Sequence, residues 1–412
     1  VPLPGIDPTV LNELSQRTTG GVLDFFNTFS GGSLSRMSLI ALGVMPYITA
    51  SIVVQLATSL SPTLAAIKKE GESGRKKLNQ YTRYGTVGLT AVQGYFIAVG
   101  LEALGASNGM QAVIEPGMAF RIAAVISLIG GTMFLMWLGE QITSRGIGNG
   151  VSLIIMAGIV AHLPTTLVNL MEGGRSGSVD PAKLIGIVVA VAVLILFICF
   201  MERAQRRILI QYPKRQTQRG MQADRSHLPL KINTAGVIPP IFASSLLLMP
   251  LTISQFAGQR VAGASKWGDF IITLNQYLQH GSPVYMLLYG AGIIFFSFFY
   301  TAVVFNPEET ADNLKRYGGF IPGIRPGKNT EAYFDYVLTR ITVIGAAYLT
   351  AICLIPEWLV SALSIPFYLG GTSLLIVVNV TMDTVTQIQS HLLAHQYGDL
   401  IKKAKLKGGR LR

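Results

Sequence analysis

Nine stretches of this sequence are long and apolar enough to cross a membrane as helices. A helix needs about 20 mainly apolar residues to span the hydrocarbon core, and charged residues fall near the ends of the stretches. Half of the 412 residues are hydrophobic and 13% are charged, against about 25% charged in soluble proteins. The sequence therefore predicts an all-α integral membrane protein, a polytopic helical bundle with spans at 37–60, 84–104, 120–141, 151–171, 183–202, 233–252, 283–305, 336–356 and 366–386.

The charges of the connecting loops predict the orientation of the spans. Lys and Arg collect on the cytoplasmic side of membrane proteins. The loop 61–83 has six basic residues and the loop 203–231 has eight, whereas the loop 105–119 has none. Both basic loops are therefore expected to be cytoplasmic, with the tail 389–412 inside and the first residue outside. Because the chain begins outside with Val1 and not Met, we expect a tenth span before it.

One short motif occurs twice. The stretch "GVMPYITASI" (43–52) returns as "GVIPPIFASS" (236–245), with Gly, Val, Pro, Ile, Ala and Ser at matching places. Five spans separate the copies, so they cross the membrane in opposite directions, as in transporters with inverted repeats around a central pathway. We interpret Pro46 and Pro239 as kinks in two helices that line such a path, where water or a neighbouring helix satisfies the freed carbonyls. The alternative is two ordinary Pro-kinked helices that converged on small residues.

The pathway is predicted to be apolar. Ion-coupled transporters keep ionisable residues near the membrane midplane, but Glu140, Arg340, Glu357 and Asp383 fall near the span ends. His162 remains, and an interface or cavity position explains it best. A narrow hydrophobic constriction resists ions without binding any of them. Its candidate residues are Val44, Ile48, Ile155, Ile241 and Ile376.

A short amphipathic element precedes the first span. In "GGVLDFFNTFSGGSLSR" (20–36), apolar residues repeat at helical spacing between two Gly-Gly pairs. The element is too short to span the membrane, so it is either a half-helix at the outer interface or a mobile stopper of the pathway. Its apolar face consists of Val22, Phe25, Phe26 and Phe29.

Several long motifs resemble the SecY family, whose members are the large subunits of the Sec protein-conducting channel. The matching pieces are "PLPGID" (2–7), "FSGGSLSR" (29–36), "IKKEGESGRKKLNQYTRYGT" (67–86), "GTMFLMWLGEQITSRGIGNG" (131–150), "HLPLKINTAGVIPPIFASS" (227–245), "FNPEETADNLKR" (305–316), "PGIRPGKNT" (322–330) and "PFYLGGTSLLIVV" (366–378). The family has ten spans and a cytoplasmic N-terminus. The resemblance therefore implies that this chain begins after the family's first transmembrane helix.

The resemblance also implies the domain organisation. Two inverted, pseudo-symmetric halves are expected around a central hourglass pore, which opens vertically for secreted chains and sideways into lipid. The implied parts are an external segment with the plug helix at 1–36, an N-terminal half at 37–171, an external hinge loop at 172–182, a C-terminal half at 183–388 with cytoplasmic docking loops 203–232 and 306–335, and a basic cytoplasmic tail at 389–412.

The resemblance assigns roles to individual residues. The aliphatic constriction corresponds to the pore ring, and the segment at about 20–35 corresponds to the plug. Gln93 matches a polar gate position, although an ordinary interhelical hydrogen bond explains it as well. The implied lateral-gate residues are Pro46, Thr49, Gln93, Pro239 and Met249, and the implied SecA and ribosome contacts are Arg206, Arg207, Lys214, Arg215 and Arg325.

The expected function is that of a channel subunit in the bacterial inner membrane. It passes unfolded, signal-peptide-bearing polypeptides and releases membrane segments sideways, with SecE, SecG, the SecA motor and the ribosome as partners. The net charge of +12 suits ribosomal RNA and anionic lipids alike.

No enzymatic activity, cofactor or metal site is expected. "HLLAH" (391–395) lacks the Glu of the zinc motif HExxH, and the glycine-bearing loops lack the spacing of a phosphate-binding loop. The alternative is an inverted-repeat secondary transporter of a small solute. A passive scaffold leaves the plug-like segment and the paired motifs unexplained.

Overall fold

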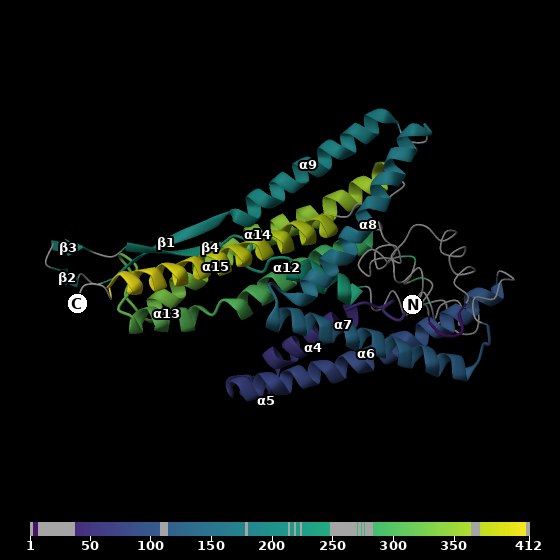
Figure 1. Cartoon of the computed structure of the whole chain (residues 1–412), viewed down its shortest axis with the longest axis horizontal. Helices are drawn as coiled ribbons and strands as arrows, with labels where there is room; N and C mark the ends of the chain where they lie inside the picture. Colours follow the sequence, from purple (N-terminus) through teal and green to yellow (C-terminus); the bar gives the residue numbers. More distant parts are fainter. Residues whose placement is uncertain are drawn as a thin grey trace. The chain divides into compact units, whose positions relative to one another are not determined.

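The chain folds into two compact units, each made mainly of helices (Figure 1). The first unit comprises Val1–Val168, Thr252–Ile272 and Ile376–Arg412, and the second comprises Asn169–Leu251 and Thr273–Leu375. The helices α8 and α15 pass from one unit to the other. This computed structural model describes residues 3–6, 38–107, 114–177, 180–212, 215–217, 220–222, 225–247, 270, 273, 276, 283–363 and 371–408.

The core of the first unit is a stack of three helices. The helix α4 packs against α6, and α6 packs against α7, where Gly94 brings α6 close to Leu128. The large side chains Ile52, Ile97 and Leu128 are fully buried among them. Between α4 and α5 the chain bends by 100°. The helices are α4 (Met45–Leu60), α5 (Pro62–Lys69), α6 (Glu72–Ser107), α7 (Met118–Arg145), α8 (Gly150–Arg175) and α15 (Gly371–Gly408).

The second unit combines long apolar helices with a small sheet region. The helix α12 packs along α14, and the short helix α13 packs on α14 as well. The side chain of Asn306 caps α13 by accepting a hydrogen bond from the backbone N–H of Glu308 at 3.2 Å. The helices are α9 (Pro181–Arg203), Ile238–Leu247, α12 (Pro283–Val304), α13 (Pro307–Arg316) and α14 (Lys328–Leu363).

Two hairpins occupy the predicted loop 203–232, in contrast to the all-α fold predicted from the sequence. Strands β1 (Gln205–Gln211) and β4 (Arg225–Lys231) pair antiparallel, and β2 (Arg215–Thr217) pairs with β3 (Gly220–Gln222). Only a short alternation of apolar residues marks them in the sequence. In β1, Ile208 and Ile210 are buried on one face of the strand, while Arg206 and Arg207 at its start are both exposed.

The described helices include five that are long and apolar enough to span a membrane. They lie in α7, α8, α9, α12 continued by α13, and α14, and the bent pair α4 and α5 makes a possible sixth. The other predicted spans fall in α6, in Ile238–Leu247 and in α15, which are not in that group. The membrane class of the fold is therefore confirmed, and the count of nine spans stays a prediction.

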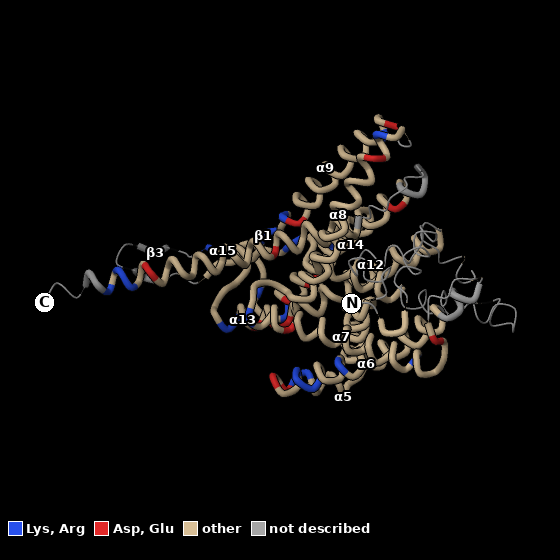
Figure 2. Tube along the Cα trace, turned by 45° about the vertical axis from the view of Figure 1, so that its right-hand side comes forward, with Lys and Arg blue, Asp and Glu red and all other residues tan. Residues whose placement is uncertain are grey.

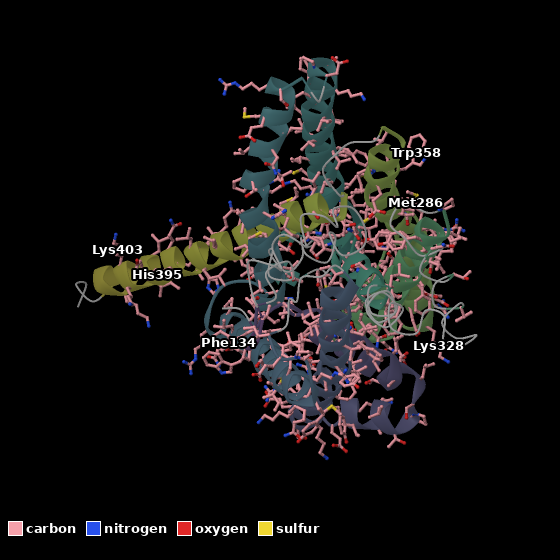
Figure 3. All side chains as sticks on the ribbon, turned by 90° about the vertical axis from the view of Figure 1, so that its right-hand side faces the viewer. Phe134, Met286, Lys328, Trp358, His395 and Lys403 are labelled. Atoms are coloured by element: carbon pink, nitrogen blue, oxygen red, sulfur yellow. The ribbon has the colours of Figure 1, made fainter. Side chains whose placement is uncertain are left out.

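Large apolar side chains cover much of the outer surface of each unit. Phe134 and Trp137 on α7 are more than half exposed, and so is Trp358 on α14 (Figure 3). In the most apolar part of α9, only 6% of the residues are buried, whereas half are buried in α14. Exposed apolar area of this kind is stable when lipid or a membrane partner covers it, so α9 has the most outward-facing surface of these spans.

Candidate functional site

Each copy of the repeated motif begins a helix with the same local geometry. Residues 39–44 and 232–237 each form a non-helical turn, which we call the first and the second leading turn. Gly43 has φ 59° and Gly236 has φ 67°, in the left-handed region that glycine adopts without strain. In each copy the carbonyl of the motif valine accepts from the isoleucine four residues on, Ile48 at 3.1 Å and Ile241 at 3.3 Å. The two motifs are therefore matching helix starts.

The prediction that Pro46 and Pro239 kink helices was wrong. The helix α4 begins at Met45 and its partner begins at Ile238, so each proline occupies the first turn of its helix. A proline is favourable there because the first backbone N–H groups of a helix have no intrahelical acceptor. The interruption in each apolar run is therefore the non-helical leading turn. The proline lies just after it, in the first turn of the helix.

Glycines on two other helices make room for the leading turns. In the first unit Gly131 of α7 lies against the carbonyl oxygen of Leu39, and in the second Gly345 of α14 lies against that of Ile232. An added Cβ at Gly345 would lie 2.5 Å from this oxygen, and the one at Gly131 would clash outright. Leu39 and Ile232 occupy matching places in the repeat, so the same contact is built twice.

A second pair of contacts extends this match. The motif alanine Ala50 faces Gly85 of α6, and its counterpart Ala243 faces Gly292 of α12. A Cβ added to the glycine would lie 3.4 Å from Ala50 Cβ and 3.2 Å from Ala243 Cβ. Small residues at such positions let helix backbones approach closely. In each copy, the motif alanine therefore packs against a glycine on the next predicted span.

The second leading turn has a polar anchor in addition. The side-chain Nδ2 of Asn233 donates to Glu202 Oε1 at 2.8 Å and to the carbonyl of Gly236 at 3.3 Å. The Tyr348 hydroxyl donates to the same carboxylate oxygen at 3.4 Å. Asn233 is 5% exposed and Glu202 is 9% exposed. The matching residue in the first leading turn is Ile40, which offers no such bond.

The five aliphatic residues predicted to form a constriction are all buried. Four belong to the first unit, where Val44 and Ile48 lie at the start of α4, Ile155 lies on α8 and Ile376 lies on α15. Thr381 of α15 donates to the sulfur of Met156 on α8 at 3.4 Å, and the backbone N–H of Gly148, just before α8, donates to Gln387 of α15. Ile241 belongs to the second unit. Their assembly into one ring stays a prediction.

The remaining predicted gate residues divide between described and undescribed parts of the chain. Thr49 is buried and its hydroxyl donates to the carbonyl of Met45, within its own helix. Gln93 is buried on α6, and within the described residues its side-chain oxygen accepts no hydrogen bond. The predicted plug residues Val22, Phe25, Phe26 and Phe29, together with Met249 and Lys214, lie outside the described residues.

The predicted docking loops of the second unit share one hydrophobic core, which we call the platform core. It joins the β1–β4 hairpin, α13, the turn at 320–324 and the start of α14. Gln211 and Phe320 exchange two backbone hydrogen bonds of 2.9 Å, which fix the hairpin to the turn. The buried members of the core are Ile208, Leu230, Ala311, Ile321, Phe334, Val337 and Ile341.

Three exposed arginines lie in or next to the elements that form the platform core. Arg206 and Arg207 are exposed on β1, and Arg325 is exposed in the turn before α14. That turn is held by Gly323 and Gly327, both with positive φ, and by Thr330, whose hydroxyl donates to the Arg325 carbonyl at 2.8 Å. The backbone at Arg325 is therefore fixed while its side chain is free to bind. For Arg215 the structure describes only the backbone, in β2.

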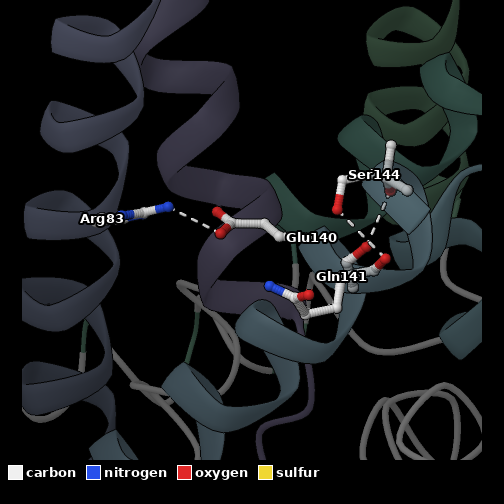
Figure 4. Close-up of polar contacts among 6 residues, drawn as sticks. Arg83, Glu140, Gln141 and Ser144 are labelled. Atoms are coloured by element: carbon white, nitrogen blue, oxygen red, sulfur yellow. Dashed lines mark hydrogen bonds and ion pairs between the residues drawn. The ribbon is translucent and has the colours of Figure 1, made fainter.

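In the first unit an ion pair joins two long helices. Arg83 of α6 and Glu140 of α7 lie 2.8 Å apart (Figure 4). Both side chains are more than a third exposed, so water screens most of their attraction.

Lys and Arg also gather around the start of α6 and along the C-terminal part of α15, near His395 and Lys403 (Figures 2 and 3). These charges suit a polar surface more than a membrane interior.

Comparison with known proteins identifies the family. A SecY family model matches residues 38–385. A relative in Escherichia coli strain K12, named protein translocase subunit SecY, is 55% identical over 409 residues, which cover 99% of this chain and 91% of the relative. The chain belongs to the SecY family. Its SecY relatives in Rickettsia bellii and Vibrio cholerae are 52% and 54% identical, and each alignment covers 99% of this chain and 92% or 91% of the relative.

Solved structures share the fold of this SecY-family chain. One, described as a protein conducting channel, aligns with a TM-score of 0.63 at 16% identity and covers 95% of this chain and 94% of the other. A second, of Sec61 in a canine ribosome-channel complex from the endoplasmic reticulum, aligns with a TM-score of 0.60 at 15% identity over the same shares. The predicted family and fold class are thus confirmed.

Sequence reasoning missed the groups that hold the leading turns in this SecY-family protein. Gly131 and Gly345 are two of 44 glycines, and nothing in the local sequence distinguishes them. Glu202 and Asn233 are 31 residues apart, and the intervening hairpins bring them together. The available signal was an acidic residue at the end of an apolar span, followed by a polar residue just before the second motif.

Replacing Gly131 by Ala should destabilise the first unit, because the new Cβ collides with the Leu39 carbonyl and the backbone must shift. Overpacking of this kind costs about 1–3 kcal/mol. The matched control is Gly130→Ala, since a Cβ at this neighbouring glycine meets nothing within 4 Å and Ala favours a helix over Gly by about 1 kcal/mol. Thermal unfolding of the purified complex measures both. Equal midpoints for the two variants would show that Gly131 does not seat the turn.

Proposed function

We propose that this chain is the pore-forming subunit of a protein translocase in the bacterial inner membrane. It passes unfolded secretory polypeptides across the membrane and releases membrane segments sideways into lipid. The observation that carries the proposal is the pair of matching leading turns, each of which starts a helix with buried aliphatic side chains at the same places. The curated relatives are named protein translocase subunits, and the family has no enzymatic reaction to assign.

The first turns of α4 and of the helix Ile238–Leu247 are proposed to line a pore and a lateral gate. Val44 and Ile48 from α4, Ile155, Ile376 and Ile241 would form a ring of branched aliphatic side chains. Such a ring deforms around an extended polypeptide and binds no ion, and dewetting closes it at rest. Pro46, Thr49, Gln93, Pro239 and Met249 would line the gate, and the segment with Val22, Phe25, Phe26 and Phe29 would close the outer side as a plug.

The domain organisation follows from the same proposal. The halves 37–171 and 183–388 would move relative to one another about the external loop 172–182, with the segment 1–36 outside and the tail 389–412 in the cytoplasm. The alternative, a secondary transporter of a small solute, has no support in the comparisons, because the similar proteins carry translocase or channel names.

The platform suits large cytoplasmic partners. Arg206, Arg207 and Arg325 are exposed and belong to or adjoin the elements that form the platform core, and Lys214 and Arg215 fall in the same loop of the sequence, 203–232. Arg side chains pair well with RNA phosphates and with carboxylates, so the ribosome and the motor SecA are the proposed occupants. The structural neighbour described in a ribosome-channel complex supports the first of these. SecE and SecG are the proposed membrane partners, and the apolar outer face of α9 offers surface for them.

Replacing Val44, Ile48 and Ile241 together by Ser should open an ion leak in the resting channel. Polar side chains lower the cost of wetting a hydrophobic constriction, so we expect resting conductance to rise by about tenfold or more. Planar-bilayer recordings of the assembled complex measure it. The matched control replaces exposed Val53, Ile294 and Ile344 by Ser. If the ring variant conducts no more than this control, the three residues do not line the pore.

Charge reversal should separate the two proposed docking sites. Arg325→Glu should lower SecA-driven export about tenfold and leave ribosome binding unchanged, because its fixed turn presents one side chain to the motor. The double reversal of Arg206 and Arg207 should weaken ribosome binding, most at low salt, where phosphate contacts are strongest. Each variant is the control for the other in vesicle export and ribosome-binding assays. Wild-type behaviour of both variants in both assays would contradict docking on this platform.

A further inference from the structure

The second leading turn is directly continuous with the docking hairpin. Glu202 stands just before β1 and Asn233 just after β4, so their 2.8 Å hydrogen bond closes the base of the hairpin. Beside it, the backbone N–H of Ile232 donates to the carbonyl of Ala204 at 3.2 Å. Within five residues of this closed base, the chain reaches the helix that begins at Ile238. A displacement of the hairpin base therefore acts on the turn itself.

One face of α14 contacts both the platform and the turn. Its residues Phe334, Val337, Ile341, Gly345 and Tyr348 follow one another at intervals of three or four, so they share one side of the helix. The first three belong to the platform core. Gly345 lies against the Ile232 carbonyl, and Tyr348 donates to Glu202. A single rigid element thus joins the exposed docking surface to the anchor of the leading turn.

The first leading turn has no counterpart of this connection among the described residues. It shares the glycine contact, through Gly131, but Ile40 stands where the second turn has Asn233. The polar anchor is therefore not required for a leading turn as such. It occurs in the unit that also contains the platform. This location favours a role in connecting the platform to the turn, in addition to holding the turn in place.

We propose that the Glu202–Asn233 pair, with this face of α14, transmits docking on the platform to the second leading turn and so to the gate helix Ile238–Leu247. The proposal rests on the proposed function, because it assumes that partners bind the platform and that this helix moves. Hydrogen bonds to a buried carboxylate are short, strong and directional. Such a pair holds the hairpin base and the turn as one body, so a partner that shifts the hairpin also shifts the turn.

Glu202 and Asn233 are positioning residues in this scheme. Loss of their hydrogen bond should leave SecA binding intact and reduce the opening of the channel that SecA induces. Asn233→Leu keeps four side-chain heavy atoms branched at Cγ but removes both donated bonds. Glu202→Gln keeps an acceptor oxygen for Asn233 and should retain most of the coupling. The matched control is Asn169→Leu, since Asn169 is exposed on α8 and lies outside the platform and the turns.

The experiment records bilayer conductance of the assembled complex before and after addition of SecA, together with SecA affinity. With Asn233→Leu we expect the SecA-induced rise in conductance to fall about tenfold, the factor expected for losing a hydrogen bond to a charged group. Its SecA affinity should stay within about twofold of wild type, since no platform contact changes. Glu202→Gln and Asn169→Leu should respond nearly as the wild type does.

Each outcome decides the proposal. A normal SecA response in well-assembled Asn233→Leu would overturn the coupling and leave the proposed function intact. If Asn233→Leu fails to assemble, Gly345→Ala tests the same connection from α14, and a normal response there overturns it equally. A wild-type complex that never responds to bound SecA contradicts the proposed function itself, and the coupling with it.

Discussion

The arrangement of this chain depends on how two backbone carbonyls, those of Leu39 and Ile232, are placed inside the protein. Each belongs to a non-helical turn that would be unstable in lipid, where every backbone polar group needs a partner. Each lies against a glycine, Gly131 or Gly345, whose missing side chain lets the turn approach a neighbouring helix. Because the turn is supported there, α4 and the helix from Ile238 begin directly after it, with a proline in the first turn of each helix and aliphatic side chains of the motif buried nearby.

The two units use this shared construction differently. In the second, the anchor residue Asn233 connects the turn to Glu202, and α14 extends the connection to a hydrophobic core beneath exposed arginines. In the first, the leading turn has an apolar residue in place of Asn233, and α6 and α7 are joined by a partly exposed ion pair that contributes little to stability. The inverted repeat thus explains the common geometry, and in the proposed coupling the second unit, which has the anchor, responds to partners on the platform.

Composition and span length predicted the membrane class, and the long motifs predicted the family, because both are properties of the local sequence. The positions of Pro46 and Pro239 were misread because an apolar run looks the same whether its first residues are helix or turn. The β1–β4 hairpin was missed because arginines interrupt its short apolar alternation. The anchor between Glu202 and Asn233 and the contact at Gly345 depend on residues far apart in sequence, so no local pattern reports them.

We infer that α4 and the helix from Ile238 face a passing polypeptide with their first turns. Photo-crosslinking to a secretory chain arrested during export tests it directly, with the probe placed at Ile48 or Ile241 in separate samples. Control probes go at Val53 and Ile294, which are exposed and lie outside the predicted ring. The account predicts crosslinks to the arrested chain from Ile48 and Ile241 and none from the controls. Crosslinks from Val53 and Ile294 but not from the motif positions would contradict it.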